Sequence, residues 1–196
     1  MQLVAYSLDL FYAWKRQFDG LANVEVIDGD ILKQVADAIV SPANSFGYMD
    51  GGLDLKYSLH FGWELEAKVR QALESEYFGE IPVGQAIVVE TDHQSIPFLI
   101  SAPTMRVPMD VSQTANAYLA FKAVLQAVIR HNRMNEQGGR QIRSILCPGL
   151  GTGEGCMPAH RCAAQMRRAY EVCVKGRYET QGGLAAAVKD HMALLE

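Results

Sequence analysis

Two kinds of apolar pattern alternate along this chain. Short apolar or alternating runs predict β-strands, whereas longer stretches with apolar residues every three or four positions predict amphipathic helices. The runs typical of strands cover residues 2–7, 24–27, 38–40, 86–89, 98–100 and 142–147. The stretches typical of helices cover residues 9–18, 65–73, 117–128 and 159–173, and a short alanine-rich helix is expected from residue 182 onward.

The ends of these segments carry residues that begin or end helices. Ser7 or Asp9 suits the cap of the first helix, Gly20 ends it, and Pro158 suits the start of the last long helix. The predicted order is strand, helix, two strands, helix, two strands, helix, strand, helix. This order indicates an α/β fold with a mixed sheet of about six strands flanked by helices. No repeat or linker interrupts the pattern, so residues 1–196 are expected to form a single domain.

The composition is that of an ordinary globular protein. Of the 196 residues, 49% are hydrophobic and 20% charged, which excludes fibrous and disordered classes and allows a sizeable core. The chain has 18 basic and 22 acidic residues, a net charge of −4. No broad basic field exists for nucleic acid, but a small anionic ligand held by backbone donors remains compatible with this charge.

The N-terminus and the cysteines indicate a cytoplasmic protein. The first residues carry no basic region and no long apolar core, and the longest apolar runs are too short to cross a membrane. The four cysteines form no Cys-x-x-Cys pair, so no zinc site is expected and the thiols should be free. No cofactor is expected. Cys162 and Cys173 fall on an apolar helical face and are expected to pack in the core.

Two glycine-rich loops carry the candidate chemistry. The first loop, residues 41–54, and the late loop, residues 147–158, each follow a predicted strand and precede a helix. Ligands bind at the carboxyl ends of strands in layered α/β proteins, and glycine lets backbone N–H groups approach phosphate closely. The two loops would together clamp a diphosphate. Either loop alone is equally compatible with a plain connection, and neither a P-loop nor Gly-x-Gly-x-x-Gly occurs, because Glu154 and Cys156 stand where the latter needs glycine.

Four segments, in order, resemble the macrodomains that bind ADP-ribose. Residues 26–31 (Val-Ile-Asp-Gly-Asp-Ile) are similar to the family's strand ending in Gly-Asp-Ile. Residues 37–44 (Asp-Ala-Ile-Val-Ser-Pro-Ala-Asn) resemble its Asp-Ala-Ile-Val-Asn-Ala-Ala-Asn. Residues 51–54 (Gly-Gly-Leu-Asp) look like its Gly-Gly-Val-Asp, and residues 148–158 look like its late loop with Thr-Gly and a closing proline. The resemblance spans residues 1–175.

The resemblance implies a three-layer fold, with a mixed sheet between helices and the ligand at one end of the sheet. By position, Asp30 would be a buried acceptor for the adenine amino group, with Ile31 packed nearby. In catalysis, Asn44 would contact the distal ribose and orient it or a water, and Asp54 would stand near that ribose as a base. The diphosphate would be held by backbone groups of the two loops, at Gly51, Gly52, Gly149, Gly151, Thr152, Gly153, Gly155 and Cys156.

Each of these residues also has a purely structural interpretation. Asp30 suits the cap of the turn before Leu32, Asn44 suits a side chain that holds its own loop, and Asp54 suits a helix N-cap. Arg106 would reach a phosphate or form a surface salt bridge. Lys56 would act as a nucleophile near the ribose or simply be a solvated helix lysine.

The late loop differs from that of the most similar catalytic macrodomains. They carry an aromatic residue between Thr-Gly and the closing proline, where this chain has Glu-Gly-Cys-Met, so Phe46 or Tyr48 would have to cover the distal ribose instead. Three functions remain open. The chain binds ADP-ribose and hydrolyses an adduct of it (an ADP-ribosyl ester, an O-acyl ester or a 1″-phosphate), or it is a non-catalytic reader. The third is an unrelated α/β enzyme using NAD or a phosphorylated metabolite.

Overall fold

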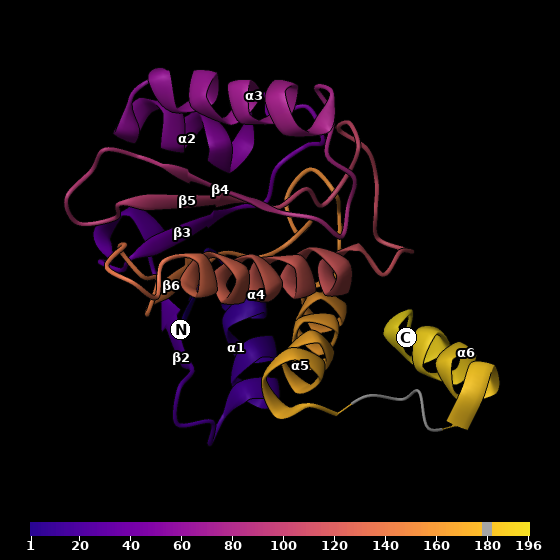
Figure 1. Ribbon diagram of the computed structural model, residues 1–196. Helices are drawn as coiled ribbons and strands as arrows, with labels where there is room; N and C mark the ends of the chain where they lie inside the picture. The colour runs from indigo at the N-terminus through magenta and orange to yellow at the C-terminus, as the bar shows by residue number, and fades with distance from the viewer. Residues whose placement is uncertain (178–181) are drawn as a thin grey trace.

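The computed structural model describes residues 1–177 and 182–196 (Figure 1). A six-stranded mixed sheet forms its centre, in the order β2-β1-β6-β3-β5-β4, with every neighbouring pair parallel except β4 and β5. The strands are β1 (Gln2–Ala5), β2 (Glu25–Asp28), β3 (Ala38–Ser41), β4 (Ile87–Glu90), β5 (Phe98–Ser101) and β6 (Ile145–Cys147).

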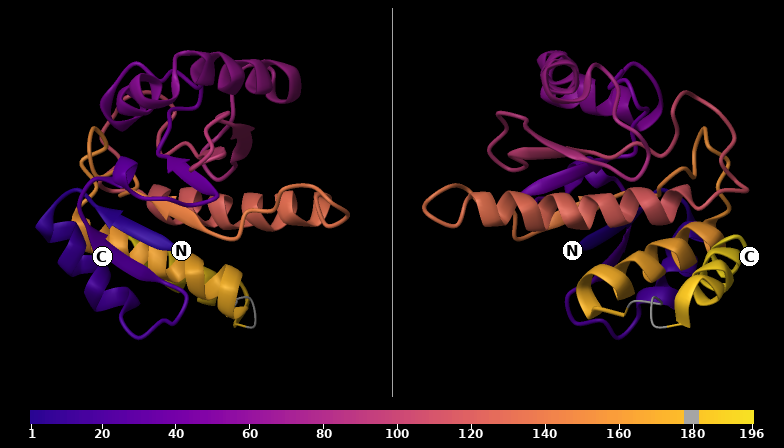
Figure 2. Two further views of the ribbon diagram at one scale, coloured as in Figure 1. Left: turned by 90° about the vertical axis from the view of Figure 1, so that its left-hand side faces the viewer. Right: turned by 45° about the vertical axis from the view of Figure 1, so that its right-hand side comes forward.

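Helices cover both faces of this sheet, as the α/β prediction requires. The helices are α1 (Leu8–Phe18), α2 (Gly52–Phe61), α3 (Glu64–Tyr77), α4 (Asn116–Met134), α5 (Ala159–Lys175) and α6 (Gly183–Leu194), with a short 3₁₀ helix η1 (Ile31–Lys33). Helices α2 and α3 lie on one face, and α1, α4 and α5 lie on the other (Figures 1 and 2). Two hydrophobic cores result, one on each side of the sheet.

Local sequence explains the first helix well. Ser7 is its N-cap, and the Ser7 hydroxyl accepts a hydrogen bond from the Leu10 N–H. Leu10, Trp14 and Phe18, spaced four residues apart, are buried against the sheet. The expected N-cap, the expected face and the end before Gly20 are therefore confirmed.

Two elements differ from the expectation. The predicted order of elements contains no helix at residues 52–61, although Asp54 was noted as suited to a helix N-cap, because the apolar residues there alternate (Leu53, Leu55, Tyr57). Strand β6 begins at Ile145 rather than at residue 142, because the Asn132 side chain takes both backbone groups of Ile142. A side chain from α4 thus replaces the first part of the strand ladder.

The topology brings the two glycine-rich loops to one edge of the sheet. β2, β1, β6 and β3 are parallel neighbours, so the segments that follow them all emerge at their carboxyl ends. In space the order is the η1 segment, the start of α1, the late loop and then the first loop.

Among the described residues, no helix combines the length and the apolar character that a membrane span needs.

Candidate functional site

The late loop is folded back on itself by its own backbone. The Met157 N–H donates to the Gly151 carbonyl at 2.9 Å, and the Cys156 N–H donates to the Gly153 carbonyl at 3.0 Å. A Cβ on Gly155 would lie 2.6 Å from the Gly151 carbonyl oxygen, which leaves room only for glycine. The glycines of this loop therefore close a tight turn as well as keep its backbone accessible.

Several N–H groups of the late loop have no partner in the chain. Within the part of the chain that the structure describes, the N–H groups of Gly151, Thr152, Gly153 and Gly155 donate no hydrogen bond. Gly151 is itself a buried residue with a φ of 73°. Backbone N–H groups near the protein interior normally find an acceptor, so this turn is chemically suited to an anionic oxygen.

A second set of unpaired donors lies at the amino end of helix α2. Its N-cap is Gly51, which has no side chain to accept from the first-turn N–H groups. Gly52, the first residue of α2, has a φ of 56°, a backbone conformation that glycine adopts without strain. The amino end of α2 thus carries orphan N–H groups and the positive end of the helix dipole.

The side chain of Asn44 holds the first loop together. Its Nδ2 donates to the Tyr48 carbonyl at 2.7 Å, and its Oδ1 accepts from the N–H groups of Phe46 and Tyr48 at 3.1 and 3.3 Å. This is the structural interpretation that the sequence left open for Asn44. One N–H of the carboxamide remains for a ligand, and contact with a ribose stays a prediction.

The two aromatic residues of the first loop are each paired with an arginine. The Arg106 guanidinium lies 5.0 Å from the Phe46 ring centroid, and that of Arg70 lies 4.7 Å from the Tyr48 ring centroid. Arg106 also donates to both carboxylate oxygens of Glu80, at 2.6 and 3.0 Å, and these hydrogen bonds hold the pKa of Glu80 below its usual range. Arg106 thus forms the surface salt bridge that was the alternative to a phosphate contact.

Asp54 lies below the surface at the junction of α2 and β3. Its side chain is 7% exposed, and its Oδ1 accepts a hydrogen bond of 2.6 Å from the Ser41 hydroxyl. Desolvation raises the pKa of Asp54 to about 7, and the Ser41 hydrogen bond opposes that shift. Asp54 is not the N-cap of α2, because Gly51 occupies that position. A carboxyl group with this pKa can accept and release a proton near neutral pH.

Asp30 and Ile31 begin the η1 turn after the edge strand β2. Asp30 caps this turn, accepting a hydrogen bond of 3.0 Å from the Leu32 N–H, and Ile31 is buried in the core on the α2 and α3 side. The carboxylate of Asp30 is exposed, whereas the sequence argument expected it to be buried. An edge strand has no neighbour to cover the loop that follows it. The adenine contact stays a prediction.

The buried ring of Tyr57 links these residues beneath the site. Desolvation raises the pKa of Tyr57 well above its usual value, and the charges of Asp54, Cys147 and Asp30 raise it further. These three groups come from α2, β6 and the segment after β2. The Tyr57 hydroxyl donates a hydrogen bond of 3.1 Å to the Val40 carbonyl, so the middle of α2 packs against β3.

The cysteines differ in environment. Cys147 and Cys162 are fully buried, and desolvation raises the pKa of both thiols. Cys156 is exposed at the tip of the late loop, with a φ of 52° that is uncommon for a residue other than glycine. Among the described residues, no group of three or more His, Cys, Asp or Glu side chains is placed to hold a metal ion.

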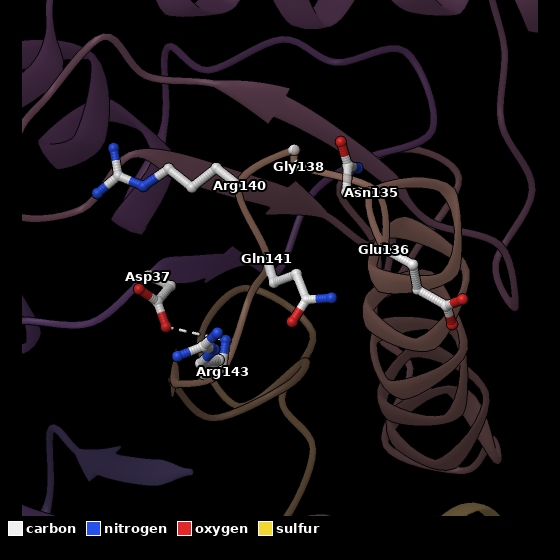
Figure 3. A pocket seen from close by; sticks show the side chains of 8 residues that line it. Asp37, Asn135, Glu136, Gly138, Arg140, Gln141 and Arg143 are labelled. Atoms are coloured by element: carbon white, nitrogen blue, oxygen red, sulfur yellow. Dashed lines mark hydrogen bonds between the residues drawn. The ribbon is translucent and has the colours of Figure 1, made fainter.

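A surface hollow at the opposite edge of the sheet is distinct from this site. It lies between the end of α4 and the start of β6, and its lining includes Asp37, Asn135, Arg140 and Arg143 (Figure 3). The Asp37 carboxylate accepts the backbone N–H groups of Arg143 and Ser144 at 2.9 and 2.8 Å. Asp37 thus anchors the entry to β6 and has a structural role.

The sequence as a whole identifies the family. Residues 40–166, more than half of the chain, match the family model described as Macro domain. An uncharacterized protein of Aquifex aeolicus is 31% identical over 144 residues, which cover 74% of this chain and 78% of that protein. An uncharacterized protein of Aeropyrum pernix is 28% identical over 150 residues, or 76% of this chain and 71% of that protein. The chain belongs to the macro domain family.

Solved structures agree with this assignment at the level of the fold. The Oceanobacillus iheyensis macrodomain is 22% identical and matches with a TM-score of 0.61 over 76% of this chain and 75% of that one. The macrodomain of Thermus aquaticus DarG is 17% identical and matches with a TM-score of 0.56 over 87% of this chain and 91% of that one. The family resemblance and the three-layer α/β fold are thereby confirmed.

Sequence reasoning missed two features of this edge. Ser41 was quoted only as part of the segment that resembles the family motif, yet its hydroxyl is the partner of Asp54. Tyr6 was treated as part of a strand, yet it is exposed beside Lys56. The two residues of each pair, Ser41 with Asp54 and Tyr6 with Lys56, become neighbours only when β1, β3 and α2 pack together. No local periodicity signals such a contact.

Proposed function

We propose that this protein binds ADP-ribose, or a derivative of it, along the carboxyl edge of its sheet. The observation that carries the proposal is the pair of unpaired backbone donor sets, one in the late loop and one at the amino end of α2. Such donors satisfy a diphosphate with little loss of conformational freedom, and an acidic protein can offer them despite its net charge of −4.

The order of the strands supports the same ligand. From β2 to β3 the edge spans three strand spacings, about 14 Å in all. An acceptor, Asp30, follows β2 at one end, the late loop with its N–H groups follows β6 in the middle, and Asn44, Asp54 and the amino end of α2 follow β3 at the other end. This sequence of groups suits an adenine, a diphosphate and a second ribose in turn. Among proteins of similar fold, the Oceanobacillus iheyensis macrodomain has been solved with ADP, and a mutant of it with ADPR.

Calorimetry of ADP-ribose binding to an Asp30→Asn variant tests this assignment. The asparagine Oδ1 keeps the cap on the Leu32 N–H, but the second oxygen becomes an NH₂ donor that faces the adenine amine. Affinity should fall about tenfold or more, because a charge-assisted hydrogen bond becomes a donor–donor contact. Asp28→Asn, at the neighbouring exposed carboxylate, is the matched control and should leave affinity unchanged. An Asp30→Asn variant that binds as well as the parent contradicts the adenine assignment.

We further propose that the site hydrolyses an ADP-ribose adduct, with Asp54 as the proton acceptor. The supporting observation is the burial of this carboxyl, which is 7% exposed; burial raises its pKa to about 7, and this suits a general base at neutral pH. Turnover of an ADP-ribosylated peptide should rise with pH through this pKa and be lost in Asp54→Asn, while ADP-ribose affinity is retained. A wild-type protein that turns over none of the ester, O-acyl or 1″-phosphate adducts contradicts the hydrolysis.

A non-catalytic reader is the second candidate, and one observation favours it. The Asn44 carboxamide makes three hydrogen bonds within its own loop, so most of its capacity is already used. Thermal shift with ADP-ribose and NAD separates both candidates from an NAD-dependent enzyme. A ligand that binds only the folded state raises the melting temperature, so ADP-ribose should raise it and NAD should do so less.

A further inference from the structure

The side chains of Tyr6 and Lys56 are neighbours, although they come from different elements of the fold. Tyr6 connects β1 to α1 and is 89% exposed, although it is a large aromatic residue. The Lys56 ammonium, from the middle of α2, lies 5.5 Å from the centroid of the Tyr6 ring. At this distance an ammonium group is attracted to the face of an aromatic ring. The pair bridges the α2 side of the site to the end of β1.

The register of the sheet shows where this bridge lies. Ala5 pairs with Asp28 on β2, so Tyr6 is one residue beyond the paired strands, next to the turn that Asp30 caps. On its other side β1 pairs with β6, which runs into the late loop. Val4 packs on the α2 and α3 side, and Tyr6 lies on that side too, because its ring is 5.5 Å from the Lys56 ammonium of α2. The bridge therefore lies between the two ends of the candidate site.

Lys56 brings a positive charge to this position. It forms no ion pair with any carboxylate in the described ranges, and its partner is the neutral Tyr6 ring. Arg106, the other cation considered for the phosphate, is held by Glu80. The remaining donors of the candidate site are uncharged, namely the backbone N–H groups and the Asn44 carboxamide. A dianionic diphosphate held only by such groups retains charge that a nearby ammonium group stabilises.

We propose that Lys56 is the counter-ion of the bound diphosphate and that the Tyr6 ring holds it in place. This inference rests on the proposed binding of ADP-ribose. It adds that the site favours ligands whose phosphate groups carry negative charge. The Tyr6 ring reduces the freedom of the lysine before the ligand binds, which lowers the entropic cost of the contact. Loss of either residue should therefore weaken binding, with the larger effect at Lys56.

Calorimetry with ADP-ribose at about 50 and about 300 mM salt tests the pair, because salt screens an exposed charge contact. Lys56→Gln should weaken binding about tenfold at the lower salt and make affinity less dependent on salt. Tyr6→Leu should weaken it about two- to fivefold, whereas Tyr6→Phe keeps the aromatic face and should bind normally. Lys122→Gln is the matched control, because Lys122 lies 5.7 Å from the Tyr118 ring on α4, away from the site.

The outcomes separate this inference from the function on which it rests. Tyr6 and Lys56 are exposed, so the variants should melt at the temperature of the parent protein. If the parent binds ADP-ribose and Asp30→Asn weakens it, but Lys56→Gln matches the parent at both salt concentrations, the inference is wrong and the proposed function stands. If the parent binds no ADP-ribose, both are wrong.

Discussion

The buried carboxyl group of Asp54 gives the folded protein a pH dependence whose sign can be worked out. Desolvation raises its pKa from 3.8 to about 7. An unfolded chain releases this proton near the lower value, whereas the folded chain keeps it up to the higher one. The contribution to stability is therefore fully present below about pH 4 and is lost as pH rises through about 7.

The size of this effect follows from the shift. A difference of about 3 pKa units corresponds to about 4 kcal/mol of unfolding free energy. The positive end of the α2 dipole favours the ionised carboxylate in the first turn and so opposes this shift. We therefore expect a measured contribution of about 2–4 kcal/mol to the unfolding free energy. This is a substantial part of the stability of a typical domain.

Asp54→Asn isolates this contribution. The asparagine oxygen still accepts the hydrogen bond from Ser41, but the side chain no longer titrates. Urea unfolding of both proteins from about pH 4 to about pH 8 should show the variant gaining stability relative to the parent as pH rises. Carboxylates with lowered pKa, such as Asp37 and Glu171, affect both proteins equally and cancel in the difference. A difference that stays constant across this range refutes the argument.

Three further predictions concern stability and local order. Ser41→Ala removes the donor to Asp54, so the pKa of that carboxyl should rise and the pH at which stability falls should shift upward in the same titration. Gly155→Ala should cost about 1–3 kcal/mol in urea unfolding, because the added Cβ would meet a loop carbonyl oxygen at 2.6 Å, whereas Gly153→Ala meets nothing within 4 Å and should cost little. Equal unfolding free energies for the two glycine variants would contradict this prediction. Gln165→Leu removes the hydrogen bond that its amide donates to the end of α6, so amide exchange in residues 183–194 should accelerate while that of α1 stays unchanged.

The elements that the sequence predicted correctly are those in which one local signal decided the outcome. Helix α1 has a cap at Ser7 and a clean apolar face, and both are present in the structure. Helix α4 was expected with about four turns at residues 117–128 and instead runs from Asn116 to Met134. Its last turn is stabilised at Asn132 and Asn135 by hydrogen bonds that involve side chains, and no apolar period reveals them.

By itself, the sequence determined the layered α/β class, the family and the two glycine-rich loops, because these depend on local periodicity and on short motifs. Only the tertiary structure decided which side chains remain available at the site. Arg106 is 26 residues from Glu80, and Tyr6 is 50 residues from Lys56, yet packing makes each pair neighbours. Burial likewise raised the pKa of Asp54, since desolvation depends on every element that covers a group and not on the residues beside it.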